Sequence, residues 1–191
     1  MFGAAAAFIL QGPPRVPGND LALAYFQCSV RFFPMIEQSD KDQEHYTILL
    51  VEDDLNDIFL VKRAFKMARI QNPLQVVTDG QEAIQYLRGE GKYSDRQTYP
   101  LPKLIVMDIK MPRLSGFEVL EWVKGDGKPL RRIPIVIVSS SGNPADVNHA
   151  YELGANAYMV KPVEFKAVEH LFESITHYWG LECAKPELEA V

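Results

Sequence analysis

Short apolar runs and longer amphipathic stretches alternate through the middle of the chain. The runs are rich in β-branched residues, and several are almost continuously apolar, which is typical of strands buried on both faces of a parallel sheet. Five runs fit this description: 46–51, 74–78, 104–108, 135–139 and 157–160. We expect each of them to form a strand.

Helical periodicity fills the gaps between these runs. Ile58, Val61 and Phe65 are spaced three and four residues apart, which places them on one face of a helix. Ser115 with Glu118 forms a capping-box pattern and predicts the start of another helix. The order of strand and helix, repeated five times, predicts an α/β fold: a doubly wound five-stranded parallel sheet with helices on both faces.

Turn and capping residues predict where further elements begin and end. Asn143 followed by Pro144 predicts a helix start, and Gly154 predicts the end of that helix. The stretch 90–102 is polar and longer than the other connections, so we expect it to be a surface loop.

The two ends of the chain differ in character from its middle. Residues 1–34 carry three charged side chains and contain prolines that interrupt regular structure, so we expect 1–44 to be a poorly ordered extension. Another interpretation is that Met35 is the biological start. We expect one folded domain over 45–180, followed by a short tail over 181–191. The longest apolar run of the extension, residues 4–10, is far shorter than the roughly 20 residues that span a bilayer, which predicts no membrane partner.

Composition narrows the expected partners and location. Apolar residues make up 47% of the chain and the net charge is −5, so the charge balance gives no reason to expect nucleic-acid binding. Cys28 and Cys183 are too few for a disulfide framework and have no metal-ligand spacing. We therefore expect two free thiols in a reducing cytoplasm.

Polar residues follow four of the five predicted strands. They are Glu52, Asp53 and Asp54 after the first strand, Asp108 after the third, Ser139 at the end of the fourth and Lys161 after the fifth. The carboxyl ends of parallel strands meet at one edge of the sheet, which is where ligands bind in such folds. We assign Asp54 to the start of the next helix, because helix dipoles favour an acidic residue there.

This set of side chains has the chemistry of a phosphoryl site. Clustered carboxylates repel one another and need a cation, and oxygen ligands suit Mg²⁺. A backbone carbonyl after Asp108 can complete the metal shell. Lys161 adds a second positive charge, and the Ser139 hydroxyl can donate to a phosphoryl oxygen. An aspartate beside a metal and a lysine is a candidate nucleophile for covalent phosphate capture.

Four motifs together resemble the receiver domain of two-component response regulators. The motifs are ILLVEDD at 48–54, MDIKMP at 107–112, VSS at 138–140 and GANAYMVKP at 154–162. The resemblance extends from about residue 46 to residue 179. It implies the flavodoxin-like strand order 2-1-3-4-5. It also implies that Asp108 accepts a phosphoryl group from a histidine kinase, and that the protein is a phosphoryl acceptor rather than an enzyme.

The resemblance also implies a role for each site residue. The metal ligands would be Asp53 and Asp108 directly, Glu52 through water and the backbone carbonyl of Lys110. Ser139 and Lys161 would bind the phosphoryl group. Tyr158 would be an aromatic switch that turns inward when Ser139 moves. The Lys161–Pro162 peptide bond would be cis.

A narrower likeness concerns the partners. The segments DGQEA at 79–83, YLRGEG at 86–91, PRLSG at 112–116 and YW at 178–179 look like stand-alone receivers that serve phytochrome-type histidine kinases. A kinase of that type is the expected upstream partner. We also expect a homodimer through the face formed by 144–154, Tyr158 and 164–179, because Tyr178 and Trp179 stand at a helix end where aromatic residues often anchor interfaces. Phe165 and Phe172 fit the buried stripe of the same helix.

Two other functions fit parts of the pattern. A hydrolase with an aspartate nucleophile needs a second acidic residue two positions after the nucleophile. Lys110 occupies that position, which disfavours the hydrolase hypothesis. A degenerate receiver that binds partners without phosphorylation is the alternative function. The full set of Asp53, Asp108, Ser139 and Lys161 favours the phosphorylated receiver over it.

Overall fold

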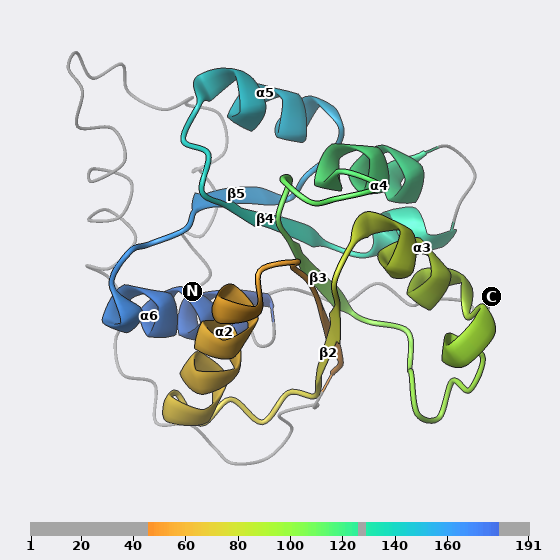
Figure 1. The fold of residues 1–191 in the computed structure, drawn as a ribbon, viewed down its shortest axis with the longest axis horizontal. Coiled ribbons are helices and arrows are strands. Elements are labelled where there is room, and N and C mark those ends of the chain that lie inside the picture. The colour runs from red at the N-terminus through yellow and green to blue at the C-terminus, as the bar shows by residue number, and fades with distance from the viewer. Residues whose placement is uncertain (1–45, 126–128, 180–191) are drawn as a thin grey trace, which may run out of the picture. The chain divides into compact units, whose positions relative to one another are not determined.

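A five-stranded parallel sheet with the strand order β2-β1-β3-β4-β5 organises the molecule (Figure 1). The computed structural model describes residues 46–125 and 129–179. The strands are β1 (Ile48–Val51), β2 (Leu74–Val77), β3 (Leu104–Met107), β4 (Ile135–Ser139) and β5 (Ala157–Val160). The predicted sheet and its strand order are confirmed. The predicted extension and tail, 1–44 and 181–191, lie outside the described residues.

Helices cover both faces of this sheet. They are α2 (Leu55–Met67), α3 (Gly80–Arg88), α4 (Gly116–Lys124), α5 (Pro144–Glu152) and α6 (Phe165–His177), with 3₁₀ turns η1 (Gly91–Tyr93) and η2 (Pro129–Arg132). Helices α2 and α6 pack together on one face, and α3, α4 and α5 lie on the other (Figure 1). None of these helices has the length and apolar character needed to cross a membrane.

Local sequence signals account for the helix starts. Ser115 and Glu118 form the predicted capping box of α4, in which each side chain bonds to the other residue's backbone N–H. Asn143 caps α5 by accepting from the backbone of Ala145, and Asp54 caps α2 by accepting from Asn56. The assignment of Asp54 to the helix start is therefore confirmed.

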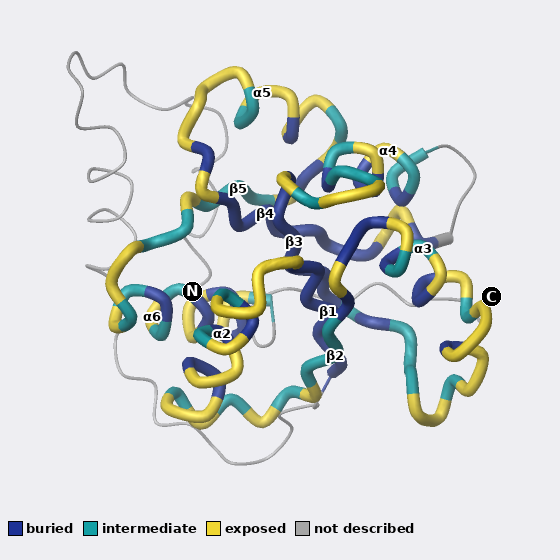
Figure 2. The backbone as a smooth tube through the Cα atoms, in the orientation of Figure 1, coloured by how far each residue is buried: buried dark blue, intermediate teal, exposed yellow. Residues whose placement is uncertain are grey.

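Burial is deepest in the three central strands (Figure 2). Because successive side chains of a strand point to opposite faces, Leu49 and Val51 of β1 enter the core under α3, α4 and α5. Ile48 and Leu50 enter the core under α2 and α6. The edge strands β2 and β5 are only partly buried.

One prediction about this fold is incomplete and another is wrong. The stretch 90–102 is not simply a surface loop, because its Tyr93 is buried and packs with Tyr99 against Tyr86 of α3. Aromatic rings of this size stabilise a connection by burying apolar area, which the polarity of the surrounding residues concealed. The Lys161–Pro162 bond is trans, as are the other peptide bonds of the described residues; trans is the lower-energy form of an X–Pro bond.

Candidate functional site

The strand register brings the predicted site residues to one edge of the sheet. Val51 of β1 pairs with Met107 of β3, so Glu52 and Asp108 follow directly after paired neighbours. The backbone N–H of Asp108 donates to the carbonyl of Val51, and that of Lys161 donates to the carbonyl of Ser139. These backbone bonds fix where the site side chains leave the ends of β1, β3, β4 and β5.

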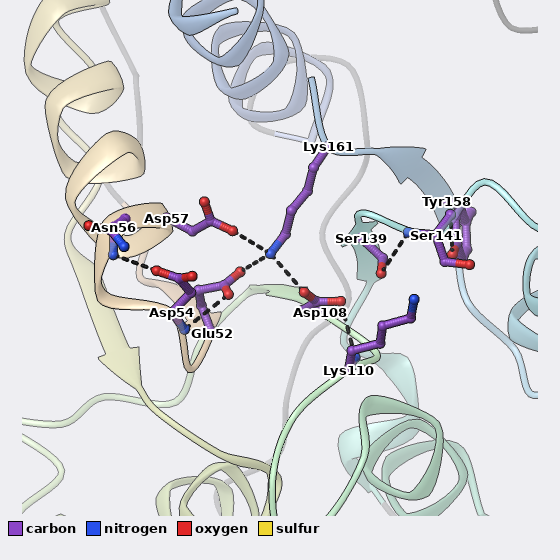
Figure 3. A network of polar contacts seen from close by, with 10 residues as sticks. All are labelled: Glu52, Asp54, Asn56, Asp57, Asp108, Lys110, Ser139, Ser141, Tyr158 and Lys161. Atoms are coloured by element: carbon purple, nitrogen blue, oxygen red, sulfur yellow. Dashed lines mark hydrogen bonds and ion pairs between the residues drawn. The ribbon is translucent and has the colours of Figure 1, made fainter. Parts of the chain in front are cut away.

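The ammonium group of Lys161 is the centre of this edge (Figure 3). Its Nζ donates to Glu52 Oε2, Asp57 Oδ2 and Asp108 Oδ2, each at 2.7 Å. The Glu52 and Asp108 side chains are 4% and 6% exposed, that of Lys161 is 18% exposed and that of Asp57 is 35% exposed. An ammonium has three donors, so each of them has a carboxylate acceptor.

Burial and charge pull the pKa values of this cluster in different directions. Burial raises the pKa of Glu52 to about 7, although the hydrogen bond and charge of Lys161 oppose the rise. Burial also works to lower the pKa of Lys161, but the hydrogen bonds to Asp108, Asp57 and Glu52 outweigh it and raise that pKa above its ordinary value. Lys161 is therefore a fixed cation, whereas Glu52 changes its protonation near neutral pH.

A mostly apolar cavity of about 40 Å³ lies against this cluster. Glu52, Asp57, Asp108 and Lys161 contribute to its lining. Its other walls come from apolar residues of β1, α2, β3, β4 and α6 and from Pro162. Electrostatic attraction is stronger beside such walls than in water, so the ion pairs here are held more tightly than surface pairs.

The loop after Asp108 is held close to the acceptor. The backbone N–H of Lys110 donates to Asp108 Oδ1 at 3.1 Å. A Cβ atom on Gly116 would lie 2.2 Å from the carbonyl oxygen of Asp108, so only glycine allows α4 to begin there. Arg113, with φ of 67°, forms an ion pair with the buried Asp79, which caps α3. These contacts tie the loop both to the acceptor and to a neighbouring helix.

Neutral hydroxyl groups occupy the other side of the acceptor. Ser139 is buried, and its Oγ accepts from the backbone of Ser141 at 3.4 Å. The Tyr158 hydroxyl donates to the Ser141 carbonyl at 2.8 Å, while its backbone N–H donates to the Tyr151 hydroxyl. Burial raises the pKa of Tyr158, so its hydroxyl remains a donor at neutral pH. Figure 3 shows this chain of contacts on the side of Asp108 away from Glu52 and Asp57.

One member of the ion cluster was missed by sequence reasoning. Asp57 lies in the first turn of α2, where an acidic residue is already explained by the helix dipole. Its position four residues after Asp53, one turn into the helix that leaves the site, is the signal that could have identified it. By contrast, Asp53 and Lys110 are exposed.

The fit of the site to a metal rests on its donor chemistry. In the described part of the chain, no group of three His, Cys, Asp or Glu side chains is arranged to hold an ion. Glu52 and Asp108 instead converge on Lys161, which shows that this edge needs positive charge. Carboxylate and carbonyl oxygens are the ligands that Mg²⁺ prefers, so the residues present fit such an ion once their side chains turn from Lys161.

Comparisons with known proteins agree with this geometry. Residues 48–173 match the response regulator receiver domain family. The response regulator Rcp1 of Synechocystis sp. is 35% identical over 141 residues, covering 74% of this chain and 93% of Rcp1. The phosphorylated cyanobacterial phytochrome response regulator RcpA superposes with a TM-score of 0.68 at 35% identity, covering 75% of this chain and 99% of RcpA. A Mn²⁺-bound structure of Rcp1 superposes with a TM-score of 0.66 at 34% identity, covering 74% and 99% of the two chains.

Proposed function

Because this chain belongs to the response regulator receiver family, we propose that Asp108 accepts a phosphoryl group from a sensor histidine kinase. The observation that supports this role best is the 2.7 Å contact between Asp108 and Lys161 at the carboxyl edge of the sheet. The protein would act as a phosphoryl acceptor in a two-component system, with at most self-catalysed phosphorylation and dephosphorylation. We propose that the protein lies in the cytoplasm, and that the kinase and the receiver meet there.

Phosphoryl transfer to Asp108 would be a displacement at phosphorus. A carboxylate oxygen of Asp108 forms the new O–P bond as the P–N bond to the kinase histidine breaks, and the departing imidazole takes up a proton from solvent. Lys161 offsets the negative charge of the phosphoryl oxygens, and the Ser139 hydroxyl donates to one of them. Later attack by water on phosphorus regenerates the carboxylate and releases phosphate.

Oxygen ligands at the same edge would hold a divalent cation, for which Mg²⁺ is our proposal. The ligands would be Asp53 and Asp108, Glu52 through water and the backbone carbonyl of Lys110. Such an ion, when bound, neutralises charge on the transferring phosphoryl group. The Mn²⁺-bound structure of the similar Rcp1 supports a divalent cation at this site.

The kinase must approach the edge that carries Asp108, and apolar side chains stand beside it. Leu55 and Phe59 of α2 are largely exposed, one helical turn apart, and Val163 after β5 is fully exposed. Exposed apolar residues around a polar site are typical of transient protein interfaces. The similar RcpA is a cyanobacterial phytochrome response regulator, so we propose a phytochrome-type kinase as the partner.

The signal would leave through the face made by α5, β5 and α6. Tyr151, Val160 and Tyr178 are about half exposed on these elements, whereas Phe172 is buried as expected. Tyr158, on β5, connects this face to the Ser141 backbone beside the acceptor, which supports its proposed role as the switch. We propose a homodimer through this face, and sedimentation of the phosphorylated and free chain would measure it.

Incubation with acetyl phosphate and Mg²⁺, followed by intact mass, tests the proposed function. The wild-type chain should gain one phosphoryl group, and Asp108→Asn should gain none while keeping the same fold by circular dichroism. EDTA should prevent the gain. A wild-type chain that stays unmodified but still binds the kinase would instead favour the alternative, a receiver that acts without phosphorylation.

A further inference from the structure

Asp57 is the carboxylate of the ion cluster that has no part in the proposed phosphoryl chemistry. Glu52 and Asp108 follow strand ends and have proposed roles at the metal and the acceptor, whereas Asp57 projects from the first turn of α2. Its Oδ2 nevertheless lies 2.7 Å from Lys161 Nζ, as close as the other two carboxylates. A side chain that takes one third of the donors of Lys161 must influence where that ammonium lies.

The other two partners of Lys161 change when the site is loaded. A cation bound at this edge would compete with the Lys161 ammonium for the carboxylates of Glu52 and Asp108. Phosphorylation then replaces the Asp108 carboxylate with a neutral acyl group that carries the phosphoryl oxygens. Of the three carboxylates, Asp57 is the one with no proposed role at the metal or at the phosphoryl group, so its contact with Lys161 can persist through both events.

We propose that Asp57 is a positioning residue, which anchors Lys161 so that its ammonium stays directed at the phosphoryl group on Asp108. This inference rests on the proposed function. The anchor lies on the rigid first turn of a helix whose start is fixed by the Asp54 cap. The Asp57 side chain is 35% exposed, whereas the lysine that it contacts is 18% exposed.

Removal of the Asp57 charge has two effects of opposite sign, and this makes the inference testable. A less negative edge attracts an anion more strongly, which would tighten phosphoryl binding. Loss of the anchor frees Lys161 to move among other partners, which would weaken phosphoryl binding. Asp54→Asn is the matched control, because it removes one charge three residues away while Asn keeps the helix cap. The Asp54 carboxylate bonds to the backbone of Asn56 rather than to Lys161.

The experiment measures the affinity of the full-length chain for beryllofluoride, a phosphoryl mimic, by calorimetry in Mg²⁺. Asp57→Asn should bind beryllofluoride about three- to tenfold more weakly than wild type. A loss of that size is expected when one charge-assisted hydrogen bond is removed at a partly exposed position. Asp54→Asn should bind as tightly as wild type or slightly more tightly. Asp57→Glu, which restores the carboxylate at the same helix position, should fall between wild type and Asp57→Asn.

The outcomes separate this inference from the proposed function. Binding by Asp57→Asn that equals or exceeds that of Asp54→Asn would overturn the anchoring role while the phosphoryl site stands. A Glu variant as weak as the Asn variant would also contradict it, because the carboxylate would then not be the active group. A wild-type chain that binds no beryllofluoride and takes no phosphoryl group from acetyl phosphate would overturn the proposed function, and this inference with it.

Discussion

Asp108 stands between two regions of different chemistry. On the β1–α2 side, Glu52 and Asp57 share one largely buried ammonium with Asp108, and each contact is 2.7 Å long. On the β4–α5 side, neutral hydrogen bonds of 2.8 and 3.4 Å link Ser139, Ser141 and Tyr158, and the carboxylate of Asp146 accepts from the Ser141 hydroxyl. Charged contacts near an apolar wall are strong and costly to break, whereas neutral ones are weak and easily exchanged. The ionic side is therefore suited to hold a phosphoryl group, and the neutral side to move in response.

Replacement of Lys161 should produce the largest difference between the two sides. Lys161→Met leaves Glu52 and Asp108 buried without a cation, and should lower the free energy of unfolding by about 3–5 kcal/mol. Urea denaturation at pH 8 in EDTA measures the loss. Lys92→Met is the control, because Lys92 pairs with Glu82 at 2.6 Å but is mostly exposed, and it should cost under about 1 kcal/mol. Equal losses in the two variants would show that the ionic side is no stronger than a surface pair.

The pH dependence of stability should also arise on the ionic side. Burial raises the pKa of Glu52 from 4.5 to about 7, so between these values the folded state binds more protons than the unfolded state. The unfolding free energy should therefore fall as pH rises from about 4.5 to about 7. Relative to Glu52→Gln, wild type should lose about 2–3 kcal/mol over this window, measured by urea denaturation without Mg²⁺. Parallel curves for the two proteins would refute a buried Glu52 that titrates near neutrality.

Divalent cations should act on the ionic side and leave the neutral side unchanged. Mg²⁺ at ten times its dissociation constant should stabilise the folded state by about 1–1.5 kcal/mol through mass action. Thermal melts should show this gain in wild type and in Ser139→Ala, but should show it reduced in Asp53→Ala. A Mg²⁺ response that disappears in Ser139→Ala and persists in Asp53→Ala would show that our proposal places the ion on the wrong side of Asp108.

The smallest effect is expected on the neutral side. Tyr158→Phe removes the donor to the Ser141 carbonyl and should reduce the unfolding free energy by about 0.5–1.5 kcal/mol. Its uptake of phosphoryl groups from acetyl phosphate should stay near that of wild type. Tyr151→Phe, which loses the acceptor for the Tyr158 backbone, serves as the comparison. A loss of phosphoryl uptake in Tyr158→Phe as large as that in Lys161→Met would erase the distinction between the two sides.

The parts of this molecule that sequence could predict are those with short-range causes. Strands were recognised from continuous apolar runs, and helix starts from caps such as Ser115 and Asn143, because both signals lie within a few residues. The convergence of Asp108 and Lys161 was predictable from the parallel topology, which places carboxyl ends together. The roles of these two residues stay predictions, as do those of Glu52, Asp53, Lys110, Ser139 and Tyr158.

The features that sequence did not predict depend on distant packing. The contact of Asp57 with Lys161 joins residues 104 positions apart, and an acidic residue in a first helical turn has an adequate local explanation. The burial of Tyr93 likewise depends on rings from α3 and the following loop. Neither contact leaves a periodic pattern along the chain.

The structured connection after α3 has a consequence for how the protein opens. Arg96 donates to the carbonyls of Tyr86 and Leu87 at the last turn of α3, and the buried ring of Tyr93 packs against Tyr86. In hydrogen exchange, a segment bound in this way opens together with the helix that it covers, rather than fraying as an independent loop. Residues 91–99 and α3 should therefore form one cooperative unit, with amide protons that become accessible to solvent in a single event.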